Sequence, residues 1–88
     1  MSWRLEYSEA ARKQLRKMDA AQRRLLLTWM DKHIDGCDDP RAQGKALVGQ
    51  FAGAWRYRVG NYRVLCELYD DRAVVLAIKV GHRRDVYR

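Results

Sequence analysis

Three arginines are spaced so that they would share one face of a β-hairpin. Residues 55–68 read W-R-Y-R-V-G-N-Y-R-V-L-C-E-L, and apolar and basic residues alternate before the Gly-Asn pair. Glycine and asparagine tolerate the positive φ angles of a two-residue turn, so this pattern predicts a hairpin. The turn sets Arg58 opposite Arg63, one pair away from Arg56. Like charges facing each other destabilise a sheet, so we expect an anion to bind among them.

The C-terminal tail carries more groups of the same kind. If the last strand runs antiparallel to its neighbour, its end returns to the level of Arg63. The residues delivered to that end of the sheet are then His82, Arg83, Arg84 and Tyr87. Guanidinium groups bind phosphate oxygens through paired N–H donors, so this set predicts a phosphate-binding site. The alternative is a solvated basic face without a ligand.

Other catalytic chemistries have little support in the sequence. Histidine is a common general acid or base near neutral pH, which makes His82 a candidate. Serine occurs only at positions 2 and 8, and Ser8 is expected to cap a helix, which disfavours a serine–histidine–acid triad. Cys66 is predicted to point into the core. Because Cys37 and Cys66 lack the spacing of a metal site, we expect free thiols, no metal and no cofactor.

Length and charge bound the class of protein. Eighty-eight residues predict a single domain spanning 1–88. The net charge of +7 favours an acidic partner: nucleic acid, an anionic membrane or an acidic protein. No apolar run is long enough for a transmembrane helix, and the first residues lack the apolar region of a signal peptide. We therefore expect a cytoplasmic protein without a membrane partner.

Two helices are predicted after a short first strand over residues 2–7. Ser8 would cap a helix over 9–18, where apolar residues recur at helical spacing. Asp19 would cap a second helix that ends near Gly36. Its expected apolar face consists of Leu25, Leu26, Trp29, Met30, His33 and Ile34. The near absence of a loop between the helices predicts an antiparallel pair.

A connection and three strands complete the predicted fold. Residues 37–53 read as a loop that Leu47, Val48 and Phe51 pin to the body of the domain. The hairpin follows, and the apolar run 73–80 predicts a central strand. The fold class is therefore α+β: an N-terminal strand, a helical hairpin, then three antiparallel strands in one small sheet packed under two helices.

The open face of this sheet is expected to carry an apolar strip beside the arginines. The strip consists of Leu65, Tyr69, Val74, Leu76 and Ile78. An apolar strip next to a basic rim suggests two occupants, a phosphate-bearing ligand and a protein that buries the strip.

The element order, with W-R-Y-R-V-G-N-Y-R-V and V-G-H-R-R-D-V-Y-R, resembles the RelE branch of the RelE/ParE toxin superfamily of type II toxin–antitoxin systems. The resemblance covers essentially the whole chain. RelE-like toxins are metal-independent endoribonucleases that cleave mRNA in the ribosomal A site, and a cognate antitoxin neutralises them. In their reaction the 2′-hydroxyl of the RNA attacks the adjacent phosphate and leaves a cyclic phosphate and a 5′-hydroxyl.

The family's catalytic positions are occupied in this chain, with one departure. The resemblance assigns catalytic roles to Arg56, Arg58, Arg63, Arg83 and Tyr87. Arg56 and Arg58 stand where the family has lysines, and arginine holds its proton too tightly to act as a base. Proton transfer is therefore expected from Tyr87, with His82 as the second choice. His82 and Arg84 are expected to bind RNA.

Two other functions stay open. ParE-like toxins have the same fold without the catalytic set and inhibit DNA gyrase by binding it. A basic nucleic-acid-binding module without catalysis is the third reading. The full set of arginines and the tyrosine favours the nuclease, whose expected partners are a cognate antitoxin, the ribosome and mRNA.

Overall fold

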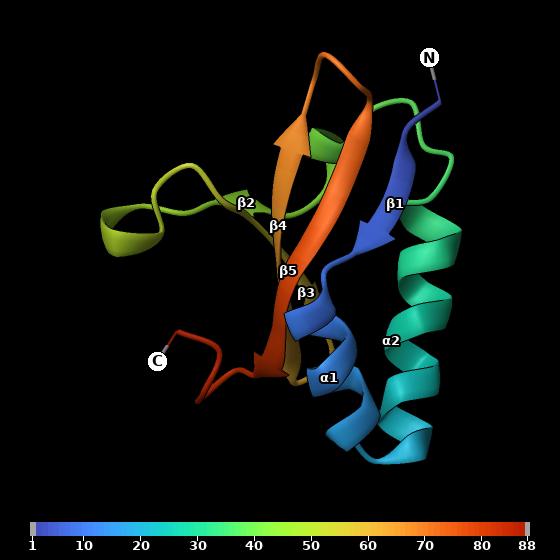
Figure 1. Ribbon diagram of the computed structural model, residues 1–88, viewed down its shortest axis with the longest axis vertical. Helices are drawn as coiled ribbons and strands as arrows, with labels where there is room; N and C mark the ends of the chain where they lie inside the picture. The colour runs from blue at the N-terminus through green and yellow to red at the C-terminus, as the bar shows by residue number, and fades with distance from the viewer. Residues whose placement is uncertain (1, 88) are drawn as a thin grey trace.

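A computed structural model describes residues 2–87, in which two helices cover one face of a five-stranded sheet (Figure 1). The strand order across the sheet is β1-β5-β4-β3-β2. The strands are β1 (Arg4–Tyr7), β2 (Lys45–Ala46), β3 (Trp55–Val59), β4 (Tyr62–Tyr69) and β5 (Val74–His82). β1 and β5 run parallel, and the other neighbours are antiparallel. The predicted α+β class is confirmed, with β2 as one strand more than expected.

Both helices begin at the residues that the sequence indicates. The Ser8 side chain accepts a hydrogen bond from the Ala11 amide at the start of α1 (Glu9–Lys17). The Asp19 carboxylate caps α2 (Ala20–His33) in the same way, which satisfies amides that the helix leaves free. Neither helix is long and apolar enough to cross a membrane, within the part of the chain that the structure describes.

The buried stripe of α2 is narrower than predicted. Leu26, Met30 and Ile34 recur at four-residue spacing, and all three are buried against the sheet. Leu25 was expected on this face but is 64% exposed, because it lies about 100° around the helix from Leu26. The prediction for Leu25 is therefore wrong, and its side chain is left on the outer surface.

The hairpin has the predicted register. Trp55 pairs with Cys66, Tyr57 with Val64 and Val59 with Tyr62, across a two-residue turn whose Gly60 has φ of 59°. Side chains from these pairs face the helices and form the sheet's share of the core. The fully buried residues of this layer include Tyr57, Val64, Cys66, Val75 and Ala77.

A β-bulge interrupts the pairing of β4 with β5. Leu65 pairs with Lys79 while its neighbour Cys66 pairs with Ala77, so Ile78 has no partner on β4. The first turns of α1 satisfy the backbone here: the Ser8 hydroxyl donates to the Ile78 carbonyl at 3.3 Å. The Val80 amide donates to Gln14 Oε1 at 2.6 Å. The helix therefore holds the irregular part of β5 in place.

The long connection between α2 and β3 is more ordered than a simple loop. It contains the 3₁₀ turns η1 (Pro40–Ala42) and η2 (Gly49–Phe51), with β2 between them. The expected anchoring role of Val48 is wrong, because this side chain is 85% exposed. Two polar contacts fix the first half of this connection instead.

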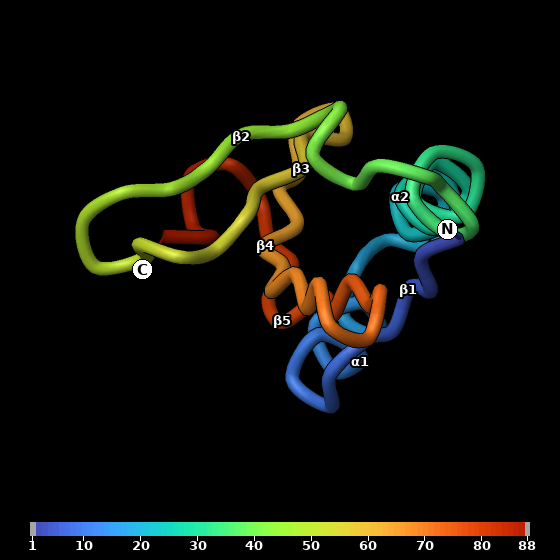
Figure 2. The backbone as a smooth tube through the Cα atoms, turned by 90° about the horizontal axis from the view of Figure 1, so that it is seen from above, coloured from blue at the N-terminus to red at the C-terminus, as the bar shows by residue number. Residues whose placement is uncertain are grey.

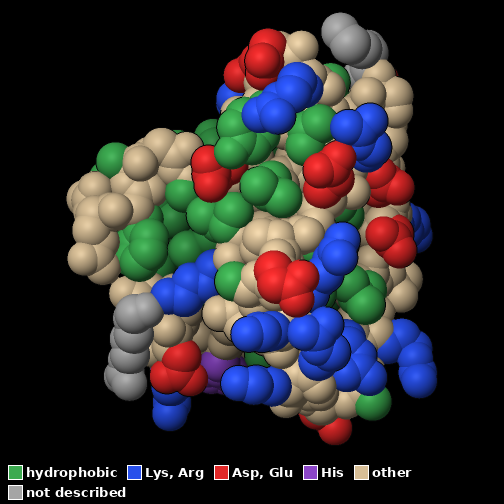
Figure 3. All heavy atoms as spheres, in the orientation of Figure 1, with side chains coloured by type: hydrophobic (Ala, Val, Ile, Leu, Met, Phe, Trp, Pro, Cys, Tyr) green, Lys and Arg blue, Asp and Glu red, His purple; other side chains and the backbone are tan. Residues whose placement is uncertain are grey.

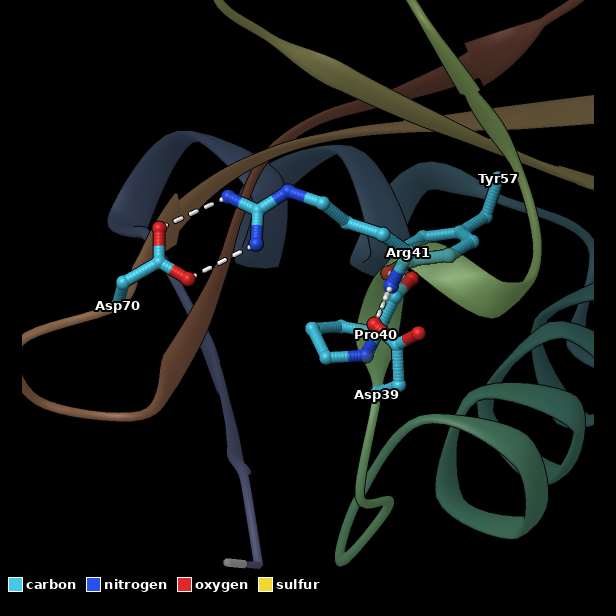
Figure 4. A network of polar contacts seen from close by, with 5 residues as sticks. All are labelled: Asp39, Pro40, Arg41, Tyr57 and Asp70. Atoms are coloured by element: carbon cyan, nitrogen blue, oxygen red, sulfur yellow. Dashed lines mark hydrogen bonds and ion pairs between the residues drawn. The ribbon is translucent and has the colours of Figure 1, made fainter.

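Both contacts meet at η1 (Figure 4). The Tyr57 hydroxyl donates to the Pro40 carbonyl at 2.6 Å. The Arg41 guanidinium binds both carboxylate oxygens of Asp70 at 2.8 and 2.9 Å, and Asp70 lies in the β4–β5 turn. A bidentate pair fixes orientation as well as distance. These hydrogen bonds therefore hold η1 against the sheet, just before the chain enters β2.

Candidate active site

The arginines gather at the turn end of the β3–β4 hairpin, on the face away from the helices. Arg58 pairs directly with Arg63, and Arg56 is two residues before Arg58 on the same face of β3. One nitrogen of Arg63 donates to the Gly60 carbonyl at 3.2 Å and to the Tyr62 carbonyl at 3.1 Å. These bonds hold the guanidinium of Arg63 beside the turn.

The C-terminal tail folds back to the same turn. The Arg83 amide donates to the Asn61 carbonyl at 2.8 Å, which fixes the start of the tail at the hairpin. Val86 is 1% exposed and packs over Gly81, where an added Cβ would lie 3.4 Å from Val86. Gly81 pairs with Arg63, so the tail turns over the arginine face of the sheet.

The electrostatics of Arg63 reflect its positively charged surroundings. Burial lowers the pKa of the Arg63 guanidinium, and the positive charges of Arg56 and Arg58 lower it further. Tyr87 raises this pKa, whereas Arg83 lowers it. The cluster concentrates positive charge that a bound anion would offset.

Arg56 has an unused hydrogen-bond donor. Its Nε is buried and, within the described structure, has no hydrogen-bond partner. Buried donors are normally paired, so an unpaired one calls for a missing acceptor. Arg56 and Arg58 also line a polar hollow of about 250 Å³, together with Trp29, Gln43 and Gly44. A phosphate oxygen is an acceptor that suits this donor.

Two of the predicted RNA-binding residues have different surroundings. His82 pairs with Tyr62, and their rings meet edge to face with centroids 5.7 Å apart. Tyr62 packs against the helix-side core, so His82 faces away from the arginine face. Arg84 is exposed, and its amide donates to His82 Nδ1 at 3.3 Å. The structure therefore does not bring His82 into the arginine cluster.

Neither cysteine has the surroundings of a nucleophile. Both are free, and burial raises the pKa of the Cys66 thiol, which disfavours the thiolate. Burial also raises the pKa of Cys37. No group of three or more His, Cys, Asp or Glu side chains within residues 2–87 is arranged to hold a metal ion.

The sequence analysis expected Phe51 to anchor the connection and did not name Gln50, and it did not foresee that both residues contact Tyr87. The Phe51 and Tyr87 rings meet edge to face with centroids 5.7 Å apart. Gln50 Nε2 donates to the Tyr87 carbonyl at 3.4 Å. The available signal was that the chain's one phenylalanine lies in a glycine-rich connection, where an apolar ring needs a partner.

The outer surface of α2 holds an apolar groove that was also missed. Its volume is about 630 Å³, and its lining includes the exposed Leu25 and Trp29. The basic residues Arg24 and Lys32 also line it. Further arginines and lysines gather over α1, at the lower end of the molecule in Figure 3. A groove of this composition suits an acidic partner with apolar side chains.

Comparison with known proteins identifies the family. The family model described as "ParE toxin of type II toxin-antitoxin system" matches residues 5–87. The chain belongs to the RelE/ParE toxin superfamily. Toxin RelG of Mycobacterium tuberculosis is 30% identical over 89 aligned residues, which cover 100% of this chain and 99% of RelG.

Solved structures assign the chain to the RelE branch of this superfamily. The toxin–antitoxin complex RelBE2 from Mycobacterium tuberculosis matches with a TM-score of 0.84 at 25% identity, over 97% of this chain and 95% of that one. The isolated E. coli RelE toxin matches with a TM-score of 0.72 at 24% identity, over 92% and 84%. The α+β architecture described above is thus the RelE fold, and the chain is a type II toxin by family.

Proposed function

We propose that this RelE-branch toxin is a metal-independent endoribonuclease that cleaves mRNA in the ribosomal A site. The observation that carries the proposal is the arrangement at the hairpin turn. Arg58 pairs with Arg63, and the tail that bears Arg83 and Tyr87 is bonded to Asn61 and packs on Gly81, the partner of Arg63. Positive groups fixed before the substrate arrives stabilise the charge that builds on a phosphate during cleavage. Arg63 is held in this way by the turn carbonyls.

Each residue of the arginine cluster has a separate role in the proposed cleavage of RNA. The 2′-oxygen of the RNA forms a bond to phosphorus while the bond from phosphorus to the 5′-oxygen breaks. Arg63 and Arg83 stabilise the phosphate oxygens, and Arg58 stands beside them. Tyr87 takes the proton of the 2′-hydroxyl, or stacks on a base while water takes that proton. The departing 5′-oxygen takes up a proton from water. Arg56 offers its unpaired Nε to the neighbouring phosphate.

The ribosome has a defined part in this proposal. An arginine cluster with one tyrosine contains no strong base, so free RNA should be a poor substrate. The ribosome would hold the message with the 2′-hydroxyl in line with the scissile bond, and such orientation alone accelerates reactions strongly.

The proposed partner is a cognate antitoxin with an acidic, amphipathic segment. One matching structure is a complex of a RelE-type toxin with its antitoxin. On the predicted apolar strip, Leu65 is 1% exposed and Val74 is 5% exposed, so the chain already buries part of it. The apolar groove on α2 offers the partner a larger exposed apolar surface. Acidic segments of this kind commonly fold as they bind.

The alternative is inhibition of DNA gyrase, which the ParE name of the matching family model favours. One experiment separates the two functions. The purified toxin is added to ribosomes programmed with a defined mRNA, and cuts are mapped by primer extension. In parallel, gyrase supercoiling is measured with the same protein.

We expect cuts within codons on the ribosome and normal gyrase activity. Arg63→Ala should cleave about 100- to 1,000-fold more slowly, which is the usual loss for one donor to a developing oxyanion. Arg72→Ala, in the β4–β5 turn, is the matched control and should cleave normally. Inhibited gyrase with uncut mRNA would instead support the ParE-type function.

A further inference from the structure

An arm projects from the sheet toward the C-terminal tail. We define the arm as residues 47–54, between β2 and β3. Its base is closed by a hydrogen bond from the Leu47 amide to the Ala54 carbonyl at 3.0 Å. The η2 turn forms its tip. Seen from above, the arm and the tail lie on one side of the sheet while the helices lie on the other (Figure 2).

The tip of the arm touches Tyr87 twice. The Phe51 ring meets the Tyr87 ring edge to face with centroids 5.7 Å apart, a favourable geometry for two aromatic rings. The neighbouring Gln50 donates to the Tyr87 backbone carbonyl at 3.4 Å. One contact acts on the ring of Tyr87 and the other on its main chain, so together they restrain its position and its orientation.

Phe51 is itself held in place from the sheet. The Lys79 ammonium lies 5.7 Å from the centroid of the Phe51 ring, within the range of a cation–π contact. Lys79 pairs with Leu65 beside the bulge of β5, on the arginine face. Phe51 is half-buried, and no residue of η2 is fully buried. The Phe51 ring therefore contacts both Lys79 and Tyr87, and it lies outside the helix-side core.

We infer that Phe51 and Gln50 are positioning residues for Tyr87. This inference rests on the proposed function, in which Tyr87 acts on the RNA. The tail is bonded to the hairpin at Arg83 and packs on Gly81 through Val86, so Tyr87 follows the last of these contacts. A displacement of about 1 Å at a reacting group costs about 100-fold in rate. The arm holds the Tyr87 ring where the arginine cluster needs it. Phe51 acts through its contact with Tyr87.

The test measures cleavage of ribosome-bound mRNA by arm variants. Phe51→Ala should cleave about 10- to 100-fold more slowly while ribosome binding stays unchanged. Phe51→Trp keeps an aromatic edge for Tyr87 and should restore most of the rate. Val48→Ala changes an exposed side chain on the same arm and is the matched control, with cleavage like that of the parent.

A double variant shows whether Phe51 acts through Tyr87. In a Tyr87→Ala background, Phe51→Ala should cause no further loss, because the group it positions is gone. Hydrogen exchange of the tail amides supplies a readout independent of activity. It should be faster at residues 85–87 in Phe51→Ala and unchanged within β5.

The inference would be overturned if Phe51→Ala cleaved mRNA as fast as the parent protein. It would also be overturned if Phe51→Ala slowed cleavage equally in the parent protein and in the Tyr87→Ala variant. Unchanged exchange of the tail amides would overturn it as well. If the parent protein does not cut mRNA at all, the proposed function fails. The exchange measurement then still decides whether the arm holds the tail.

Discussion

At the scale of single residues, the proposed mechanism separates binding of charge from transfer of a proton. Turn carbonyls hold the Arg63 guanidinium. A hydrogen bond from the Arg83 amide to the Asn61 carbonyl fixes the backbone of Arg83, whose side chain is exposed. Arginine does not give up its proton near neutral pH. Of the two candidates for proton transfer, Tyr87 lies with the arginines, whereas His82 packs on Tyr62 on the other face.

This geometry predicts unequal effects of two substitutions. Tyr87→Phe keeps the ring and its contact with Phe51 but removes the hydroxyl, so we expect cleavage to fall by about 100- to 10,000-fold, the usual share of an acid or base. His82→Ala should cleave nearly as the parent does. Single-turnover cleavage on the ribosome measures both. Normal cleavage by Tyr87→Phe together with a large loss in His82→Ala would transfer the role to the histidine.

At the scale of elements, the sequence predicted what local chemistry determines. Alternation around Gly60-Asn61 established the hairpin register, and Ser8 and Asp19 marked the helix starts. The sequence did not indicate β2, because a strand of two exposed residues has no periodic pattern of apolar side chains. The contact between Phe51 and Tyr87 joins residues 36 positions apart in the sequence, so no local pattern could indicate it. The arginines were therefore predictable as a group, whereas the arm that reaches Tyr87 was not.

The Arg41–Asp70 pair gives the connection before β2 a measurable pH dependence. The hydrogen bonds from Arg41 hold the pKa of Asp70 below its ordinary value. A carboxylate with a lowered folded-state pKa stabilises the fold above its unfolded pKa of about 3.9, and this stabilisation is lost as pH falls through the folded value. We expect Asp70→Asn to unfold at lower urea than the parent at pH 6, and the difference to vanish toward pH 2.

Asp71→Asn is the control for this measurement. Asp71 is the exposed neighbour of Asp70, and its nearest contact with Arg72 is 3.9 Å long. Its substitution should leave the urea midpoint close to that of the parent at both pH values. A difference between the parent and Asp70→Asn that persists at pH 2 would show that the carboxylate charge is not what holds the connection.

At the scale of the whole molecule, the distribution of charge governs encounter with RNA. The net charge is +7, and the exposed faces of the helices carry Arg12, Lys13, Arg16, Lys17 and Arg24. We expect ribosome binding to weaken steeply with salt, because contacts with phosphates release counterions. Arg12→Ala with Lys13→Ala should reduce the slope of log affinity against log salt by about one to two. The rate of cleavage in the bound complex should not change. Equal slopes for parent and variant would mean that α1 does not face RNA.

The bulge makes Ile78 a place in β5 where the length of the chain can change. Removal of Ile78 would leave Lys79 opposite Leu65, Val80 opposite Val64 and Gly81 opposite Arg63, because Ile78 has no partner on β4. Every later side chain of β5 would keep its face, and the contact from the Ser8 hydroxyl to the Ile78 carbonyl would be lost. Relatives that share this fold should therefore tolerate loss of the bulge residue better than loss of a paired residue such as Val80.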